Sequence, residues 1–222
     1  MQNFDDVYVV IAPSGTGKTT LNKKLTEEHA SELEMSISYT TRPMREGEVD
    51  GEHYHFVSKE DFLDMVEKNK MLEWAEVHGN YYGTPIDEIE RIKGLGKKTL
   101  LEIDIQGWLN AKKILPGSKS IFIMPPSIED MWERLERRGT DNLKVRLIRL
   151  DSAKHELEGA HNCDHFIVND KIEEAYIALE NAIIRDISPK LQKERALDIV
   201  NGFLDTINNA EWLKNIRKSI DK

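Results

Sequence analysis

The sequence predicts an α/β fold with a mostly parallel β-sheet, and two observations support this prediction. First, apolar runs alternate with helix-like stretches, as they do in βαβ units; the runs are Val7–Ile11, Met35–Ser38, Thr99–Ile105, Lys119–Met124 and His165–Val168. Second, Val7–Ile11 is apolar at every position. Continuous apolarity is typical of a strand that is buried on both faces of a parallel sheet.

Two long segments interrupt this alternation. Residues 39–90 contain many polar and aromatic side chains, several glycine turns and an amphipathic pattern near 58–70 that predicts a helix. Residues 127–152 are densely charged and rich in arginine. We therefore expect a parallel-sheet core with two insertions.

Composition narrows the class of protein. The 222 residues contain 31 Lys and Arg against 40 Asp and Glu, a formal net charge of −9. An acidic chain has no overall field that favours nucleic acid or anionic membranes, and no apolar run approaches the roughly 20 residues that span a bilayer. With Cys163 as the only cysteine, no intrachain disulfide can form. We expect a cytoplasmic protein that binds neither nucleic acid nor membranes.

A glycine-rich loop follows the first strand directly. It reads Ala12-Pro13-Ser14-Gly15-Thr16-Gly17-Lys18-Thr19 and fits the phosphate-binding P-loop, with Ala12 in place of the usual first glycine. Glycines let backbone N–H groups approach phosphate oxygens, and the helix that follows directs its positive N-terminus at the anion. Lys18 can reach the outer phosphates of a nucleoside triphosphate, and the Thr19 hydroxyl can bind Mg²⁺. The alternative is a fortuitous glycine-rich turn, and the placement between a strand and a helix argues against it.

Two arginines form a second candidate phosphate site. Arg42 and Arg45 lie three positions apart and close to several hydroxyl side chains. Their planar guanidinium groups suit a phosphate dianion. The alternative is a solvated, charged loop without a ligand.

These segments resemble the guanylate kinase family, whose members transfer a phosphoryl group from ATP to GMP. The resemblance runs from about residue 7 to 186 and rests on segments in the family's order: 36–56 (SISYTTRPMREGEVDGEHYHF), 73–84 (EWAEVHGNYYGT), 101–107 (LEIDIQG), 137–149 (RRGTDNLKVRLIR) and 166–170 (FIVND). It implies a three-layer P-loop kinase core with a parallel β-sheet, a mixed α+β GMP-binding insertion and a helical lid.

The resemblance also implies a division of the chain. A guanylate kinase-like domain would span residues 1–187, with a core (1–36, 92–126 and 153–187), a GMP-binding region (37–91) and a lid (127–152). Residues 188–222 would form a C-terminal helical extension. Apolar residues recur there at Leu197, Val200, Leu204 and Ile207, spacings that predict an amphipathic helix packed on the body; the alternative is a helix that binds a partner.

Matching residues of the GMP site acquire roles from the resemblance. The set is Ser38, Arg42, Arg45, Tyr54, Glu73, Tyr82, Gly83, Thr84, Asp104, Gly107 and Arg149. The first four and Tyr82 would hold the GMP phosphate. Glu73, assisted by Asp104, would accept hydrogen bonds from guanine N1–H and the 2-amino group, and Thr84 would donate to O6. Adenine has an acceptor at N1 and no 2-amino group, so it would leave Glu73 unpaired.

The resemblance assigns the remaining roles to ATP and Mg²⁺. The ATP-binding set is Ala12, Pro13, Ser14, Gly15, Thr16, Gly17, Lys18, Thr19, Thr20, Arg138 and Asn169, the last of which would contact adenine. The residues expected to act in catalysis are Lys18, Arg42, Arg138 and Arg149. Mg²⁺ would be held by Thr19 and, through water, by Glu102.

The sequence does not show which face of the expected lid helix each arginine occupies. Arg138 and Arg149 match the family's lid arginines, but the residues between them depart from the family's acidic stretch, so Arg146 competes with Arg149. Arg134 is expected to form ion pairs along its own helix with Glu129, Glu133 and Glu136.

The expected activity is Mg²⁺-dependent transfer from ATP to GMP or dGMP by a monomer or homodimer. One alternative is a catalytically inactive guanylate-kinase-like interaction domain. Another is a kinase for a different deoxynucleoside monophosphate. A separate motif, His161-Asn162-Cys163-Asp164-His165, is expected to be a loop that enters the last strand, with a metal site as the alternative.

Overall fold

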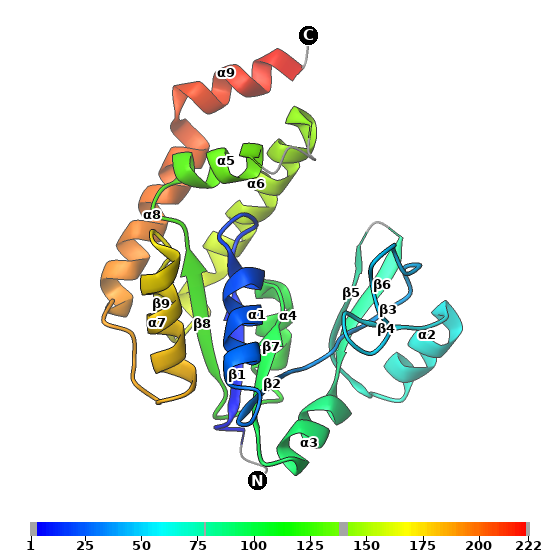
Figure 1. The fold of residues 1–222 in the computed structure, drawn as a ribbon. Coiled ribbons are helices and arrows are strands. Elements are labelled where there is room, and N and C mark those ends of the chain that lie inside the picture. The colour runs from blue at the N-terminus through cyan, green and yellow to red at the C-terminus, as the bar shows by residue number, and fades with distance from the viewer. Residues whose placement is uncertain (1–3, 78, 138–141, 221–222) are drawn as a thin grey trace. The chain divides into compact units, whose positions relative to one another are not determined.

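The structure is a computed structural model that describes residues 4–77, 79–137 and 142–220. The chain divides into two compact units, of which the first comprises residues 1–9 and 29–118 and the second residues 10–28 and 119–222. The helices are α1 (Lys18–Glu28), α2 (Lys59–Glu67), α3 (Ile86–Gly94), α4 (Ile105–Ala111), α5 (Ile128–Arg137), α6 (Leu143–Gly159), α7 (Ile172–Ile183), α8 (Lys193–Asn209), α9 (Glu211–Ile220) and the 3-10 turn η1 (Ala160–Asn162) (Figure 1). The strands are β1 (Val7–Ile11), β2 (Leu33–Met35), β3 (Tyr39–Thr40), β4 (His55–Phe56), β5 (Met71–Val77), β6 (Asn80–Pro85), β7 (Lys98–Glu102), β8 (Lys119–Met124) and β9 (His165–Val168).

The larger sheet has the strand order β2-β7-β1-β8-β9. The pairs β2–β7 and β8–β9 are parallel, with Leu33 opposite Lys98 and Ile121 opposite His165. Every residue of β1 is buried, as its apolar run predicted. The α/β class with a parallel central sheet is therefore confirmed.

Two expected strands end earlier than the apolar runs suggested. The run expected at Met35–Ser38 leaves the sheet after Met35, because the chain crosses there to a second sheet that begins at Tyr39. The run expected at Thr99–Ile105 ends at Glu102. Asp104 stops it, because its carboxylate caps α4 by accepting a hydrogen bond from the Gly107 N–H at 2.6 Å.

The smaller sheet of the first unit has the order β4-β3-β6-β5. Strands β5 and β6 form an antiparallel hairpin, with Glu73 opposite Thr84 and Trp74 opposite Gly83. Its turn contains Gly79 at φ 79°, a backbone conformation that glycine adopts without strain. Phe62 of α2 is fully buried and stacks on Tyr81 of β6, with ring centroids 5.5 Å apart. This packing holds the amphipathic helix against the sheet.

The second unit packs helices around β8, β9 and the phosphate loop. Helix α1 contacts α7, where the Tyr176 hydroxyl donates a hydrogen bond to the Glu28 carboxylate. Helices α5 and α6 contact each other, and α8 contacts both of them. Within the described part of the chain, no helix combines the length and the hydropathy that crossing a membrane requires.

The segment after residue 187 folds into helices α8 and α9. The sequence predicted a buried stripe at Leu197, Val200, Leu204 and Ile207. The structure buries Val200 and Ile207 but replaces the other two by Ala196 and Phe203. The stripe is therefore rotated by about one residue, because the large Phe203 ring provides more apolar area than either leucine. The segment packs on its own unit, where α8 contacts α5, α6 and β9.

Candidate functional site

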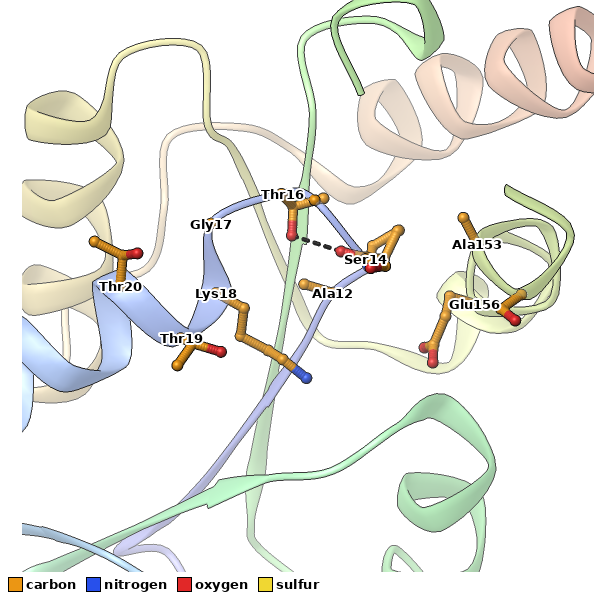
Figure 2. A pocket seen from close by; sticks show the side chains of 12 residues that line it. Ala12, Ser14, Thr16, Gly17, Lys18, Thr19, Thr20, Ala153 and Glu156 are labelled. Atoms are coloured by element: carbon orange, nitrogen blue, oxygen red, sulfur yellow. Dashed lines mark hydrogen bonds between the residues drawn. The ribbon is translucent and has the colours of Figure 1, made fainter. Parts of the chain in front are cut away.

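A cavity of 340 Å³ lies over the glycine-rich loop in the second unit. It is lined by residues 12–20 and by Ser152, Ala153 and Glu156 of α6 (Figure 2). Lys18, Thr19 and Thr20 form the first turn of α1, so the N-terminus of this helix opens into the cavity. All nine loop residues assigned to ATP are thereby brought together around a space for an anionic ligand.

Two loop positions require glycine. Gly15 and Gly17 have φ values of 88° and 89°, which L side chains rarely adopt. A Cβ atom on Gly17 would lie only 2.7 Å from Nδ2 of Asn169. The loop backbone therefore approaches Asn169 more closely than any other residue type would allow.

Buried polar contacts hold the loop in this shape. Thr16 is fully buried, and its hydroxyl donates to the Pro13 carbonyl at 2.8 Å (Figure 2). Asn169 is 4% exposed, and its amide nitrogen donates to the Thr16 carbonyl at 2.6 Å. Both side chains thus brace the loop from within.

Arg134 extends this bracing and differs from its expectation. We predicted ion pairs with the glutamates of its own helix, but its guanidinium donates to the Asn169 carbonyl at 3.0 Å. The neighbouring Arg137 takes up the expected helical pairing instead, with Glu133 at 2.9 Å. Sequence spacing alone could not reveal that β9 ends beside this face of α5.

The structure distinguishes the two competing arginines of α6. Arg149 donates from Nη1 to the hydroxyl of Ser14, in the phosphate loop, at 3.1 Å. Arg146 instead pairs with Glu136 at 2.5 Å and lies over the ring of Trp132, 5.3 Å from its centroid. Arg149 is therefore at the loop and Arg146 is engaged with α5. Arg138, the other expected lid arginine, lies outside the described residues.

Helix α6 contributes residues that the sequence analysis missed. Ser152, Ala153 and Glu156 line the cavity together with the loop. Counted from Arg149, they follow the three- and four-residue spacing of one helical face, and this spacing was the available signal. The short, polar or small side chains leave room for a ligand beside Arg149.

The first unit contains a second polar site on the β5–β6 hairpin. The Thr84 hydroxyl donates to Oε1 of the half-buried Glu73 at 2.6 Å, and it lies 3.4 Å from the Ser38 hydroxyl. Burial raises the pKa of the Glu73 carboxyl above its usual value, and the charge of Asp104 raises it further, while the Thr84 hydrogen bonds oppose the shift. Three residues assigned to GMP thus form one connected group.

Helix α4 presses its first turn against this carboxylate. A Cβ atom on Gly107 would lie 3.0 Å from Glu73 Oε2 and 3.2 Å from Asp104 Oδ1. Gly83 is equally confined, since its Cβ would lie 2.9 Å from the Glu73 carbonyl oxygen. Both glycines therefore permit the close approach that sets the position of Glu73.

A cationic cluster forms a neighbouring part of the same unit. The Arg42 guanidinium donates through both terminal nitrogens to Glu48, at 2.7 and 2.9 Å, and lies 5.6 Å from the ring centroid of Tyr54. The rings of Tyr54 and Tyr82 are in edge contact at 6.0 Å. Arg45 is exposed, and its backbone N–H donates to Glu48 at 2.7 Å. The spacing of Glu48 from Arg42 and Arg45 is visible in the sequence, but no role was predicted for this residue.

Glu48 is held ionised by these contacts. The Arg42 guanidinium, followed by the Arg45 backbone N–H, lowers the pKa of the Glu48 carboxyl to about 2. In return, Glu48 and then the Tyr82 hydroxyl raise the pKa of Arg42. The pair therefore keeps its charges throughout the physiological range.

The oxygen donors among the described side chains suit a Mg²⁺ ion that would take most of its ligands from a bound nucleotide and water rather than from the protein. Among residues 4–77, 79–137 and 142–220, no three His, Cys, Asp or Glu side chains gather into a metal cage. Thr19 is exposed at the start of α1 and lines the phosphate cavity, and Glu102 is the last residue of β7. Because Mg²⁺ in nucleotide sites takes most of its oxygens from phosphates and water, a single hydroxyl beside the phosphates is an adequate protein contribution.

Comparison with known proteins agrees with this geometry. The family model described as guanylate kinase matches residues 5–186. The guanylate kinase of Neisseria gonorrhoeae is 40% identical over 201 residues, covering 90% of this chain and 96% of that protein. The guanylate kinase of Schizosaccharomyces pombe is 45% identical over 181 residues, covering 80% and 90%. The crystal structure of guanylate kinase from Anaplasma phagocytophilum is similar with a TM-score of 0.64 and 34% identity, covering 81% of this chain and 85% of that chain. This chain therefore belongs to the guanylate kinase family.

Proposed function

We propose that this chain transfers the γ-phosphoryl group of ATP to GMP or dGMP, which yields ADP and GDP or dGDP. The observation that supports this most directly is the Glu73–Thr84 pair, hydrogen-bonded at 2.6 Å in a chain that also has a P-loop cavity. The first feature suits a guanine base and the second a nucleoside triphosphate. Family membership supports the same reaction.

Guanine recognition follows from the donors and acceptors of its edge. Guanine presents two adjacent donors, N1–H and the 2-amino group, and one acceptor, O6. The Glu73 carboxylate accepts from the donors, and the Thr84 hydroxyl turns to donate to O6. Asp104, the N-cap residue of α4, has its carboxylate against the same glycine, Gly107, as that of Glu73 and would assist as a second acceptor. Adenine and the pyrimidines do not present this pair of adjacent donors beside an acceptor, so they leave the half-buried carboxylate incompletely paired, which is a costly mismatch.

The GMP phosphate would bind at the cationic cluster. Arg42 and Arg45 supply the positive charge, and the hydroxyls of Tyr54, Tyr82 and Ser38 supply neutral donors. Glu48 fixes the guanidinium of Arg42 through two hydrogen bonds. Because the arginine is held in place before the ligand arrives, less side-chain entropy is lost on binding.

Transfer requires positioning and charge rather than covalent chemistry. A phosphate oxygen of GMP forms a bond to the γ-phosphorus while the bond from that phosphorus to the bridging oxygen of ADP breaks. The loop N–H groups and Lys18 hold the β- and γ-phosphates, and Arg149 offsets the charge of the migrating group. The lid position Arg138 is assigned the same task by resemblance. Mg²⁺, held by Thr19 and through water by Glu102, would supply further charge neutralisation to the phosphates.

The matching assay is direct. Purified chain is incubated with ATP, Mg²⁺ and GMP, and the nucleotides are separated chromatographically. We expect equal amounts of ADP and GDP. Lys18→Ala should abolish turnover yet leave GMP binding intact, and full activity of this variant would refute the P-loop assignment. Absence of any GDP from the unmodified chain would favour the inactive interaction domain instead.

A further inference from the structure

We infer that the C-terminal helices α8 and α9 position Arg149 by supporting the back of helix α6. This inference rests on the proposed role of Arg149 at the ATP phosphates. It concerns residues beyond the matched family region, which ends at residue 186. Residues of α9 would thus be positioning residues for the reaction without touching a substrate.

Helix α6 has two working faces. Arg149 reaches Ser14 of the phosphate loop, and Ser152, Ala153 and Glu156 line the same cavity. Asp151 and Lys154 lie about 200° and about 140° around the helix from Arg149. These two residues border a separate cavity of 160 Å³ whose other walls come from α8 and α9. The C-terminal helices are therefore behind α6, on the side opposite the loop.

An aromatic contact joins α9 to the lid helices. The ring of Trp212 meets that of Trp132 edge to face, with centroids 5.8 Å apart. Trp132 is also the ring over which the Arg146 guanidinium lies. A continuous series of contacts thus runs from α9 through α5 to the residue one turn before Arg149. Leu213, 1% exposed, anchors α9 beside this contact.

An ion pair adds a direct contact between α9 and α6. Arg217 of α9 donates to Asp151 of α6 at 2.7 Å. The side chains are 43% and 52% exposed, so the pair contributes little binding energy and mainly fixes register. The aromatic contact, in which Trp132 is buried and Trp212 half-buried, is therefore the main support, and the ion pair is the adjustable one.

Loss of this support is expected to displace one side chain, that of Arg149. Loss of the support lets α6 move away from the loop and takes Arg149 out of reach of the phosphates. The effect should appear in kcat and in the KM for ATP. Any change in the KM for GMP should be no larger than the change that Arg149→Ala causes, because the other residues proposed for GMP lie in the first unit.

The primary test combines Trp212 with Arg149. Trp212→Ala should lower kcat about tenfold, since small displacements of catalytic groups cost this much or more, and Trp212→Phe should recover most of it. In an Arg149→Ala background, Trp212→Ala should cause no further loss. A purely structural role predicts equal losses in both backgrounds, and that result would overturn the inference, as would wild-type kcat in Trp212→Ala.

A charge exchange keeps the test decisive if Trp212→Ala does not fold. Asp151→Lys and Arg217→Glu each place like charges together and should lower kcat about twofold, while the double variant should restore it. Lys218→Ala, an exposed neighbour on α9, is the matched control with unchanged kcat. Wild-type kcat in both single variants would overturn the inference. If Arg149→Ala alone leaves kcat intact, the proposed role of Arg149 has failed rather than the support.

Discussion

At the scale of single residues, Glu73 combines two opposed requirements. For the proposed guanine contacts its carboxylate would have to be ionised, yet burial and then the neighbouring Asp104 raise its pKa. A raised folded-state pKa means that ionisation of Glu73 costs stability as pH rises through that pKa. In the proposed complex, the N–H groups of guanine would stabilise this charge, which is a general route to selectivity.

Replacement of this carboxylate should weaken the choice of base. In Glu73→Gln, the preference for GMP over AMP, measured as the ratio of kcat/KM values, should fall at least about tenfold because an amide matches only part of the guanine edge. Kinetics with both nucleotides at fixed ATP measure the ratio. An unchanged ratio would refute the assigned role.

The same carboxyl predicts a pH dependence. The KM for GMP should rise as pH falls through the raised pKa of Glu73, beginning above the ordinary value of 4.5, because the protonated acid accepts fewer hydrogen bonds. A pH series of the KM for GMP tests this. In Glu73→Gln the rise should disappear, and its persistence would assign the titration to another group.

Glu48 should act on GMP through Arg42. In Glu48→Gln the KM for GMP should rise about tenfold, because a charge-assisted, two-point contact to Arg42 is lost. The KM for ATP should not change, and Glu46→Gln, an exposed neighbour, is the matched control. A lower KM for GMP would show instead that Glu48 competes with the phosphate.

The contacts of Glu48 stabilise the folded chain only over part of the pH range. Since its folded pKa is lowered to about 2 from 4.5, the stabilisation is complete above pH 4.5 and is lost as pH falls toward 2. The pair is therefore intact wherever the enzyme assay is run.

At the scale of elements, the sequence predicted what local patterns encode. Three elements could be predicted from local sequence patterns: the uniformly apolar β1, the loop from Ala12 to Thr19 and the amphipathic α2. The short strands β3 and β4 could not be predicted, because two-residue strands have no measurable periodicity. Strand β3 depends on pairing with β6, and β4 depends on pairing with β3. Nor could the sequence predict the contact of Arg134 with Asn169, which joins residues far apart in the chain.

The candidate site shows the same division. The phosphate-loop residues and the arginines could be predicted as site candidates because short sequence motifs identify them. Arg146 and Arg149 could be distinguished only in the structure, because they lie three residues apart on one helix. Arg146 contacts Glu136, whereas Arg149 contacts Ser14.

The loop element gives a sharp prediction at Gly17. In Gly17→Ala the new Cβ would meet Asn169 at 2.7 Å on a backbone with φ 89°, so kcat/KM for ATP should fall by about 10²-fold or more. Gly96→Ala is the control, because its φ is 71° but nothing lies within 4 Å of the added atom. If Gly17→Ala and Gly96→Ala lower kcat/KM for ATP equally, the positive φ rather than the close approach to Asn169 explains why position 17 requires glycine.

Helix α6 gives the second prediction at this scale. Arg149→Ala should lower kcat by about 10²- to 10³-fold, the loss typical of one removed charge-stabilising donor, and Arg146→Ala should lower it far less. Single-turnover kinetics with both variants compare the chemical step. The reverse ranking would transfer the catalytic role to Arg146.

At the scale of the whole molecule, the residues proposed for the two nucleotides fall largely in different compact units. The first contains the residues matched to the guanine base and most of those matched to the GMP phosphate, and the second contains the P-loop and Arg149. The net charge of −9 conceals these local cationic sites, which explains how an acidic chain can bind polyanionic substrates.

The most direct test of this account is the specificity constant across nucleoside monophosphates. With ATP and Mg²⁺ fixed, kcat/KM is measured for GMP, dGMP, AMP, dTMP and dCMP. The account predicts that GMP and dGMP exceed the others by about 10²-fold or more, because only guanine pairs with both Glu73 and Thr84. Comparable values for AMP or for either pyrimidine nucleotide would contradict it.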